Sequence, residues 1–142
     1  MKSIKTLLIF LVALTSIIPA LSFAEVRKEY YPSGELKTET NYINGIKEGI
    51  RKTYYENGQL EIETNYKKNI KEGIYKLYYE NGKLRQEGNY KNGKLEGILK
   101  MYYKKWGISY IVDTYKNGQK INRKAYHVNG KLKFEQDYPY TE

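Results

Sequence analysis

The chain has 142 residues, no cysteine, and 25 basic residues against 16 acidic ones, which gives a formal net charge of +9. The lack of cysteine excludes disulfides and thiolate metal sites, so stability must come from packing and backbone pairing alone. A single histidine, His127, leaves too few groups for a zinc site or a histidine-based acid–base pair. We therefore predict that the protein is not an enzyme and binds no metal or cofactor.

The N-terminal segment, residues 1–24, has the pattern of an export signal. Two lysines precede a largely apolar run, and Ser22-Phe23-Ala24 ends it with the small-x-small pattern that signal peptidases accept. The apolar run contains Pro19 and is shorter than the about 20 residues that a spanning helix needs. We predict cleavage after Ala24 and an exported mature chain, located in the periplasm, at the cell surface or outside the cell.

Residues 25–142 repeat themselves with a period of 24 residues. The string YYENG starts at Tyr54 and again at Tyr78, and lysines recur at the same interval. Tandem units that cannot bury an apolar face alone are typical of stacked repeat proteins. We predict one domain of five units, at about 26–49, 50–73, 74–97, 98–122 and 123–142. The fourth unit carries one extra residue near Trp106.

Each unit contains two turn signals, and most of them are Asn-Gly pairs. Such pairs supply the two positive φ angles of a type I′ turn between antiparallel strands. The turns predicted for the central units are Asn57-Gly58, Asn81-Gly82 and Asn92-Gly93. This spacing of turns predicts an all-β fold, an elongated single-layer antiparallel meander of about ten short strands built from five β-hairpin repeats.

The turn positions also predict which residues face one another. With Asn57-Gly58 at the centre of a two-residue turn, Tyr55 lies opposite Leu60 and Lys52 lies opposite Glu63. Because side chains alternate between the two faces of a strand, one face is expected to carry lysine–carboxylate pairs and the other to be apolar.

The same arithmetic predicts further lysine–carboxylate pairs in the other units. Lys76 lies opposite Glu87 by this rule. In the divergent fourth unit, a turn at Trp106-Gly107 places Lys100 opposite Asp113.

The repeated motif resembles a known family. Tyr-Tyr-x-Asn-Gly-x-Leu, followed by an Asn-Tyr pair and by a glycine that ends the unit, occurs at Tyr54–Gly73 and Tyr78–Gly97. This motif is similar to the MORN-repeat variant of many bacterial proteins, and weaker copies extend the resemblance over the mature chain. It implies an elongated, twisted sheet of stacked hairpins, used as a scaffold or for binding, and it implies no catalytic residues. Some bacterial members are assigned as antitoxins or immunity proteins of toxin systems.

Tyrosine is unusually frequent, with 17 residues, and it suits a sheet position with a ring to bury and a hydroxyl to leave in water. We predict that the protein binds another protein through a tyrosine-bearing surface of the sheet. The candidate surface consists of Tyr54, Tyr55, Tyr78, Tyr79, Tyr102, Tyr103, Trp106 and Tyr110.

Other partners remain open at this stage. Tyrosine rings also stack on sugars, so the alternatives are a module that binds cell-surface glycan or peptidoglycan, an antitoxin or immunity protein that binds a toxin, and a structural spacer. Nucleic acid is disfavoured because the lysine–carboxylate pairs and the export signal leave little uncompensated charge for it. Charged residues at the first edge, Arg27, Lys28 and Glu29, discourage pairing with other chains, so a monomer is expected.

Overall fold

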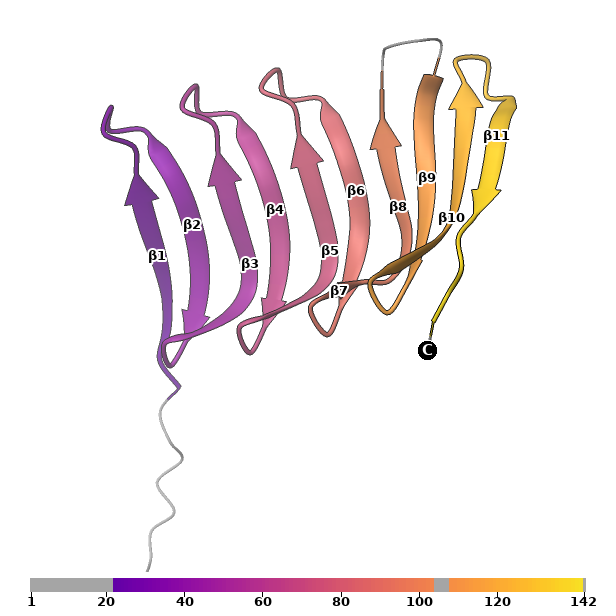
Figure 1. Ribbon diagram of the computed structural model, residues 1–142. Helices are drawn as coiled ribbons and strands as arrows, with labels where there is room; N and C mark the ends of the chain where they lie inside the picture. The colour runs from indigo at the N-terminus through magenta and orange to yellow at the C-terminus, as the bar shows by residue number, and fades with distance from the viewer. Residues whose placement is uncertain (1–21, 104–107, 142) are drawn as a thin grey trace, which may run out of the picture.

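The computed structural model describes residues 22–103 and 108–141, and these form one open antiparallel sheet whose strands lie side by side in a single row (Figure 1). Its strands are β1 (Ala24–Tyr30), β2 (Leu36–Ile43), β3 (Ile46–Tyr54), β4 (Leu60–Lys67), β5 (Ile70–Tyr78), β6 (Leu84–Lys91), β7 (Lys94–Leu95), β8 (Gly97–Tyr102), β9 (Ile108–Lys116), β10 (Gln119–His127) and β11 (Leu132–Asp137). Strands that follow one another in sequence pair in space, and the two-residue β7 adds to β6 beside β8. The predicted all-β meander is confirmed. Within the two described ranges no helix is long and apolar enough to cross a membrane.

The turns at the lower end of the sheet in Figure 1 are the predicted type I′ turns. Asn92 and Gly93 both have positive φ, at 51° and 79°, as this turn type requires. Three further turns show the same pair of positive angles, and these are Asn44-Gly45, Lys68-Asn69 and Asn117-Gly118. Asparagine is among the few residues that adopt this conformation with little strain, which explains why Asn69 can replace glycine.

The turns at the upper end are of a different kind, and the predicted type I′ geometry is wrong there. In the β3–β4 turn only Gly58 has positive φ, at 81°. The Gly58 N–H donates to the Tyr55 carbonyl (2.9 Å), and the Tyr55 N–H donates to the Gln59 carbonyl (2.8 Å). This is a three-residue loop ending in a glycine bulge. The side chain of Asn57 accepts the Gln59 N–H (2.9 Å) and so holds the loop.

Equivalent bonds close the turns that contain Gly34, Gly82 and Gly130, so Asn81-Gly82 departs from the predicted type as well. The longer loop changes the pairing next to it, because Tyr54 rather than Tyr55 lies opposite Leu60.

A bulge in the strand then restores the predicted register. Thr53 lies opposite Ile62, which leaves Glu61 as the extra residue of β4, and Lys52 lies opposite Glu63. Lys76 lies opposite Glu87 for the same reason. Two irregularities, a loop one residue too long and a bulge of one residue, therefore cancel within the β3–β4 and β5–β6 hairpins.

Burial in this sheet comes from neighbours on the same face, because the part of the chain that the structure describes has no second layer. We call the side that carries Lys52 and Lys76 the lysine face, and the opposite side, which carries Thr64, the threonine face. Thr64 is 4% exposed and lies between Arg51 and Tyr75 of the adjacent strands. The threonine face is therefore apolar only in part, in contrast to the sequence-based expectation.

Gly88 on β6 occupies the position that Thr64 has on β4, and it is needed there for packing. A Cβ atom at Gly88 would lie 2.6 Å from Cδ1 of Leu99, a side chain that is only 4% exposed. Leu99 is thus buried because its neighbour has no side chain.

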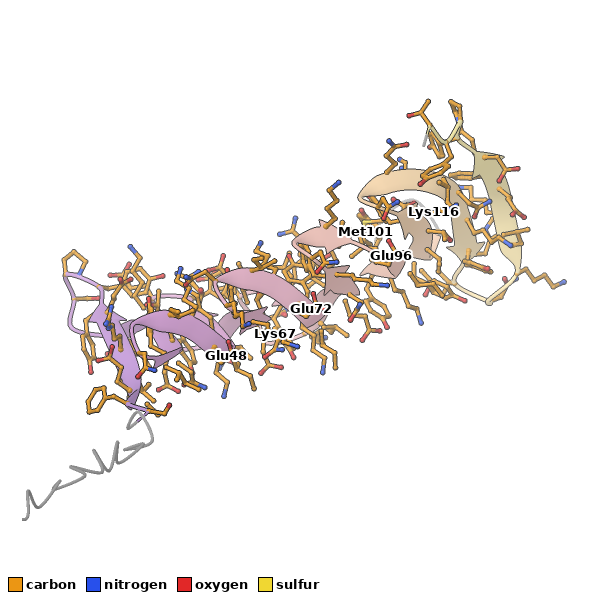
Figure 2. All side chains as sticks on the ribbon, turned by 90° about the horizontal axis from the view of Figure 1, so that it is seen from below. Glu48, Lys67, Glu72, Glu96, Met101 and Lys116 are labelled. Atoms are coloured by element: carbon orange, nitrogen blue, oxygen red, sulfur yellow. The ribbon has the colours of Figure 1, made fainter. Side chains whose placement is uncertain are left out.

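The Glu-Gly pairs of the sequence join successive hairpins at the lower end of the sheet. In each case the glutamate Oε2 accepts a backbone N–H from the turn of the next hairpin. The three bonds are Lys68 N to Glu48 (2.8 Å), Asn92 N to Glu72 (2.7 Å) and Asn117 N to Glu96 (2.8 Å). Figure 2 shows the three glutamates spaced along the length of the ribbon. The repeat motif therefore encodes contacts between units as well as the units themselves.

Candidate functional site

A ladder of tyrosine hydroxyls joins the hairpins at their upper ends. Tyr55 lies next to the β3–β4 turn, and its hydroxyl donates to the carbonyl oxygen of Tyr78 in the next hairpin (2.7 Å). Tyr31 and Tyr79 make the equivalent bonds to the carbonyls of Tyr54 (2.6 Å) and Tyr102 (2.9 Å). Several tyrosines predicted to form a binding surface are therefore used to hold the repeats together, and burial raises the pKa of Tyr55 above its ordinary value.

The ladder stops at the fourth hairpin. Tyr103 occupies the next position, but within residues 22–103 and 108–141 its hydroxyl bonds only to the sulfur of Met101, at 3.6 Å. The reason lies in the hairpin loop, where the Tyr103 N–H donates to the carbonyl of Ser109 (2.9 Å) and residues 104–108 lie between them. The loop is longer than in the other hairpins, and the regular contact to the following unit is lost.

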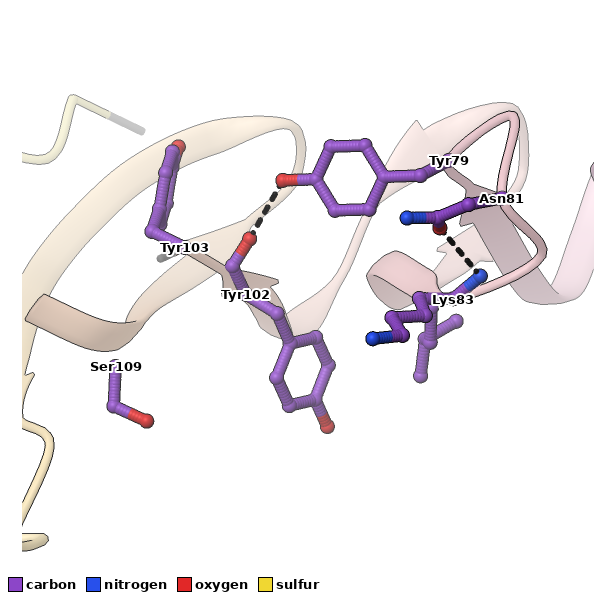
Figure 3. A pocket seen from close by; sticks show the side chains of 7 residues that line it. Tyr79, Asn81, Lys83, Tyr102, Tyr103 and Ser109 are labelled. Carbon is purple, nitrogen blue, oxygen red and sulfur yellow. Dashed lines mark hydrogen bonds between the residues drawn. The ribbon is translucent and has the colours of Figure 1, made fainter. Parts of the chain in front are cut away.

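A groove of about 540 Å³ lies where the ladder ends. Tyr79, Tyr102 and Tyr103 contribute aromatic walls, and Leu84 adds an aliphatic one. Its polar groups come from Asn81, Lys83 and Ser109. Figure 3 shows Tyr79 reaching across to the Tyr102 carbonyl, with Asn81 and Lys83 on the turn beside it. The structure thus brings three of the predicted binding residues into one concave site.

The rings of this groove remain accessible. Tyr79 is 36% and Tyr103 41% exposed, although Tyr79 also serves the ladder. Tyr102 is half-buried, and its hydroxyl donates to Glu87 Oε1 (2.8 Å) on the lysine face. Burial, followed by this hydrogen bond, raises the pKa of Tyr102. The groove therefore offers neutral aromatic surface with hydrogen-bonding groups at its rim.

Tyr110 lies apart from the groove, in an aromatic cluster on the lysine face. The ammonium of Lys100 lies 5.0 Å from the centre of the Tyr102 ring and 4.6 Å from that of Tyr110. The Tyr110 ring in turn stacks on that of Tyr126, with centroids 4.6 Å apart. Cation–π contacts of this kind stabilise the lysine between the two rings.

The predicted pair of Lys100 and Asp113 is wrong. Lys100 lies opposite Val112, and Leu99 lies opposite Asp113. The loop is two residues longer than in the regular hairpins and no bulge follows it, so the register differs from theirs by one residue. Asp113 is therefore on the threonine face, where it is 1% exposed and accepts two hydrogen bonds from Arg123, at 2.7 and 2.6 Å. These bonds raise the pKa of the Arg123 guanidinium above its ordinary value.

The other four lysine–carboxylate pairs lie in register, and two of them form ion pairs. The Nζ atom of Lys28 is 3.3 Å from Glu39, and that of Lys124 is 3.1 Å from Glu135. In the described part of the chain, no contact within 4 Å joins Lys52 to Glu63 or Lys76 to Glu87. On the lysine face, lysines and carboxylates therefore alternate from strand to strand, and the attraction between opposite charges on neighbouring strands stabilises the sheet.

Comparison with protein families gives one match. The model described as MORN repeat variant matches residues 26–44, 47–68 and 71–92. Residues 26–92 of this chain therefore belong to the MORN repeat variant family. The three matched segments each cover one hairpin turn at the upper end of the sheet and end at the type I′ turn below it. Comparison with curated proteins gives no match.

The groove lies at the border of the matched MORN repeats. Tyr79, Asn81, Lys83 and Leu84 belong to the third matched segment, whereas Tyr102, Tyr103 and Ser109 lie beyond it. Half of the groove therefore comes from regular MORN sequence and half from the divergent hairpin.

Sequence reasoning missed a second set of tyrosines on the threonine face of this MORN sheet. Tyr66 and Tyr90 stand at equivalent positions on β4 and β6, and each ring lies beneath a lysine of the preceding strand, β3 or β5. The Nζ atom of Lys47 is 5.4 Å from the Tyr66 ring centre, and that of Lys71 is 4.9 Å from the Tyr90 ring centre. The repeated Asn-Tyr pairs of the motif mark these tyrosines in the sequence. The motif does not show on which face of the sheet they lie until the strand register is known.

Tyr54 and Tyr78 are half-buried and accept ladder hydrogen bonds through their carbonyls. Trp106 and its turn with Gly107 lie outside the described residues. Within residues 22–103 and 108–141, no cluster of three or more His, Cys, Asp or Glu side chains could hold a metal ion.

Proposed function

We propose that this MORN protein is an exported, non-enzymatic scaffold that binds a segment of another protein in the tyrosine-lined groove between the third and fourth hairpins. The observation that carries the proposal is the end of the ladder at Tyr103. In the regular hairpins the equivalent tyrosine joins two units, whereas the ring and hydroxyl of Tyr103 are left for another contact.

The chemistry of the groove supports a peptide segment as the ligand. Tyrosine is enriched at protein interfaces because its ring gives a large contact area at little conformational cost, and its hydroxyl still forms hydrogen bonds. Lys83, exposed on the neighbouring turn, adds a positive charge at the rim. A partner segment with an apolar side chain for the groove and a polar or acidic neighbour would fit this arrangement.

A photo-crosslinking amino acid at Tyr103 tests the proposal directly. In the cells that make the protein, we expect a discrete protein adduct from position 103 and none from position 30. Tyr30 is a suitable control because it is 59% exposed but lies on β1, at the far end of the sheet. Adducts of equal pattern at both positions, or none at position 103, would contradict a specific protein partner.

A glycan ligand is the second candidate, since tyrosine rings flanked by Asn81, Lys83 and Ser109 also suit a sugar. Sedimentation of the purified chain with isolated cell wall separates the two ligands. Retention that soluble sugar abolishes, and that Tyr103→Ala removes, would favour the glycan. A soluble chain that still gives the protein adduct would favour the protein partner, of which a toxin is one class.

Export rests on residues 1–24, and it is tested separately. The protein recovered from outside the cytoplasm should begin at Glu25 when its N-terminus is determined by mass spectrometry. Recovery of the full-length chain from the cytoplasm alone would contradict export.

A further inference from the structure

The two end strands of the sheet have unpaired outer edges. β1 pairs only with β2, and β11 pairs only with β10, among the strands that the structure describes. Every residue of β11 is exposed, and so are six of the seven residues of β1. Each edge therefore presents a row of backbone N–H and C=O groups that could pair with another strand.

The repeat makes these two edges complementary to each other. β11 is the equivalent of β2 and β4, because Leu36, Leu60 and Leu132 begin these strands at multiples of 24 residues. β1 is likewise the equivalent of β3 and β5. Inside the sheet, the outer edge of β2 pairs with β3 and that of β4 pairs with β5.

The strand pairings between successive hairpins, which we call the internal joints, share one register at β2–β3, β4–β5 and β6–β8, and differ only at β9–β10 among the described strands. The shared register fixes how the ends would meet. The glutamate of each hairpin lies opposite the lysine of the next, as seen for Glu39 and Lys52 and again for Glu63 and Lys76. Continuing this register places Glu135 opposite Lys28 of a second copy. Because β11 and β1 are the equivalents of β2 and β3, the joint would repeat the backbone pairing of β2 with β3.

We propose that chains associate head to tail, with β11 of one copy pairing antiparallel with β1 of the next. Glu135 would then lie between Lys124 of its own chain and Lys28 of the second copy, as Glu63 lies between Lys52 and Lys76 within one chain. Opposite charges directly across a pair of strands stabilise the pairing.

The charges on β1 protect the edge less than the sequence suggests. Arg27 binds Glu25 on the same strand, and Lys28 is 3.3 Å from Glu39. Glu29 accepts a hydrogen bond from Thr38 (3.0 Å). Each charge is already engaged by its own chain, so an approaching strand meets no unopposed like charge.

The proposed pairing of β11 with β1 of a second copy lacks one contact that the internal joints have. At the ladder position next to the β10–β11 turn stands His127, where the earlier hairpins have Tyr31, Tyr55 and Tyr79. The tyrosine hydroxyl bond to the next unit is therefore missing. Association is accordingly weaker than the internal joints and depends on protein concentration, and because the contact is heterologous it forms chains or closed rings.

Disulfide trapping tests the register of the proposed pairing. The chain has no cysteine, so the introduced cysteines are the only thiols that can react. Phe134 and Glu29 of a second copy would be directly opposite, as Thr38 and Thr53 are inside the sheet. The double variant Phe134→Cys/Glu29→Cys should give a ladder of linked dimers, trimers and higher species on mild oxidation. The control, Phe134→Cys/Lys68→Cys, places the second thiol in a remote turn and should not. Equal linking in both variants, or none in the first, would overturn the proposal.

Charge exchange gives an independent test by sedimentation velocity. The weight-average mass of the unmodified chain should rise with protein concentration. Lys28→Glu and Glu135→Lys should each lower the association constant at least tenfold. An equimolar mixture of the two variants should recover it, because the exchanged edges are again complementary. His127→Tyr should strengthen association by restoring the ladder donor. A constant monomer mass for the unmodified chain and for His127→Tyr, or a mixture no better than its components, would refute the joint.

Discussion

The regular hairpins of β2 to β6 and the divergent hairpin of β8 and β9 use the same residue types for different purposes. In the regular part, a carboxylate lies opposite a lysine on the lysine face, and a tyrosine hydroxyl joins each hairpin to the next. In the divergent part, the carboxylate of Asp113 is buried on the other face and the ladder tyrosine Tyr103 is released.

The difference shows how much a single register step changes in a sheet. Side chains alternate with a period of two, so a shift of one residue moves every following side chain to the opposite face. Here the shift converts a surface carboxylate into the partner of Arg123 and opens a groove beside Tyr103. The regular repeats are joined by hydrogen bonds between hairpins, and the irregular one borders the groove that we propose as the binding site.

The largest effect is expected from removal of Arg123. Arg123→Ala leaves the carboxylate of Asp113 buried without its partner, which should lower the free energy of unfolding by about 3 kcal/mol. Arg51 is the matched control, because it lies in the same row of the threonine face within the regular part. Arg51→Ala should cost well below half as much in urea unfolding, and equal losses would show that the Asp113–Arg123 pair is not special.

An intermediate effect is expected at the border between the two regions. Gly88→Ala places a Cβ against Cδ1 of Leu99 and should cost about 1–3 kcal/mol through overpacking. The double variant Gly88→Ala/Leu99→Ala provides the control, since the clash is absent from it. In a double-mutant cycle the two losses should sum to clearly more than the loss of the double variant, and simple additivity would exclude the clash.

A smaller effect separates the ladder tyrosines of the two regions. Tyr55→Phe removes a hydrogen bond of 2.7 Å to the next hairpin and should lower the free energy of unfolding by about 1 kcal/mol. Tyr103→Phe removes only a weak contact to the Met101 sulfur and should change stability very little. Equal losses from the two variants would mean that the ladder does not end at the fourth hairpin.

The smallest effect concerns alkaline pH. Burial raises the pKa of Tyr75 in the regular part and of Tyr115 in the divergent part, where Asp113 raises it further. A folded-state pKa above the unfolded value means that stability is complete below about pH 10 and is lost as the pH rises through the folded values.

Urea unfolding between neutral and alkaline pH measures this loss. Tyr75→Phe and Tyr115→Phe should each reduce this loss, because each removes a tyrosine whose pKa is raised in the folded state. Stability that rises with pH over this range would contradict the direction of both pKa shifts.

Most of the fold follows from local signals in the repeats. Asn92-Gly93 and its equivalents define the lower turns because few residues other than Asn and Gly adopt both positive φ angles. The sequence predicts the wrong turn type at Asn57-Gly58, because the same dipeptide occurs in two-residue and in three-residue loops. Only the hydrogen bonds of Tyr55 distinguish these two loop types. Lys52 still lies opposite Glu63, because the bulge at Glu61 offsets the loop.

The candidate site was less predictable than the fold. The abundance of tyrosine predicts Tyr79, Tyr102 and Tyr103 as binding residues. The local sequence does not show which tyrosine hydroxyls bond to the next hairpin. That distinction depends on the carbonyl of the next hairpin, 23 residues away for Tyr79. The burial of Asp113 could not be foreseen either, since it depends on the length of the loop between β8 and β9.

The sequence by itself determined the repeat, the strand order and the row of lysines and glutamates, because period, turn residues and alternation are properties of neighbouring residues. The tertiary structure alone decided which tyrosines join hairpins, which face Asp113 takes and where a groove opens. These features depend on contacts between hairpins, and a longer loop without the usual bulge changes those contacts in the fourth hairpin.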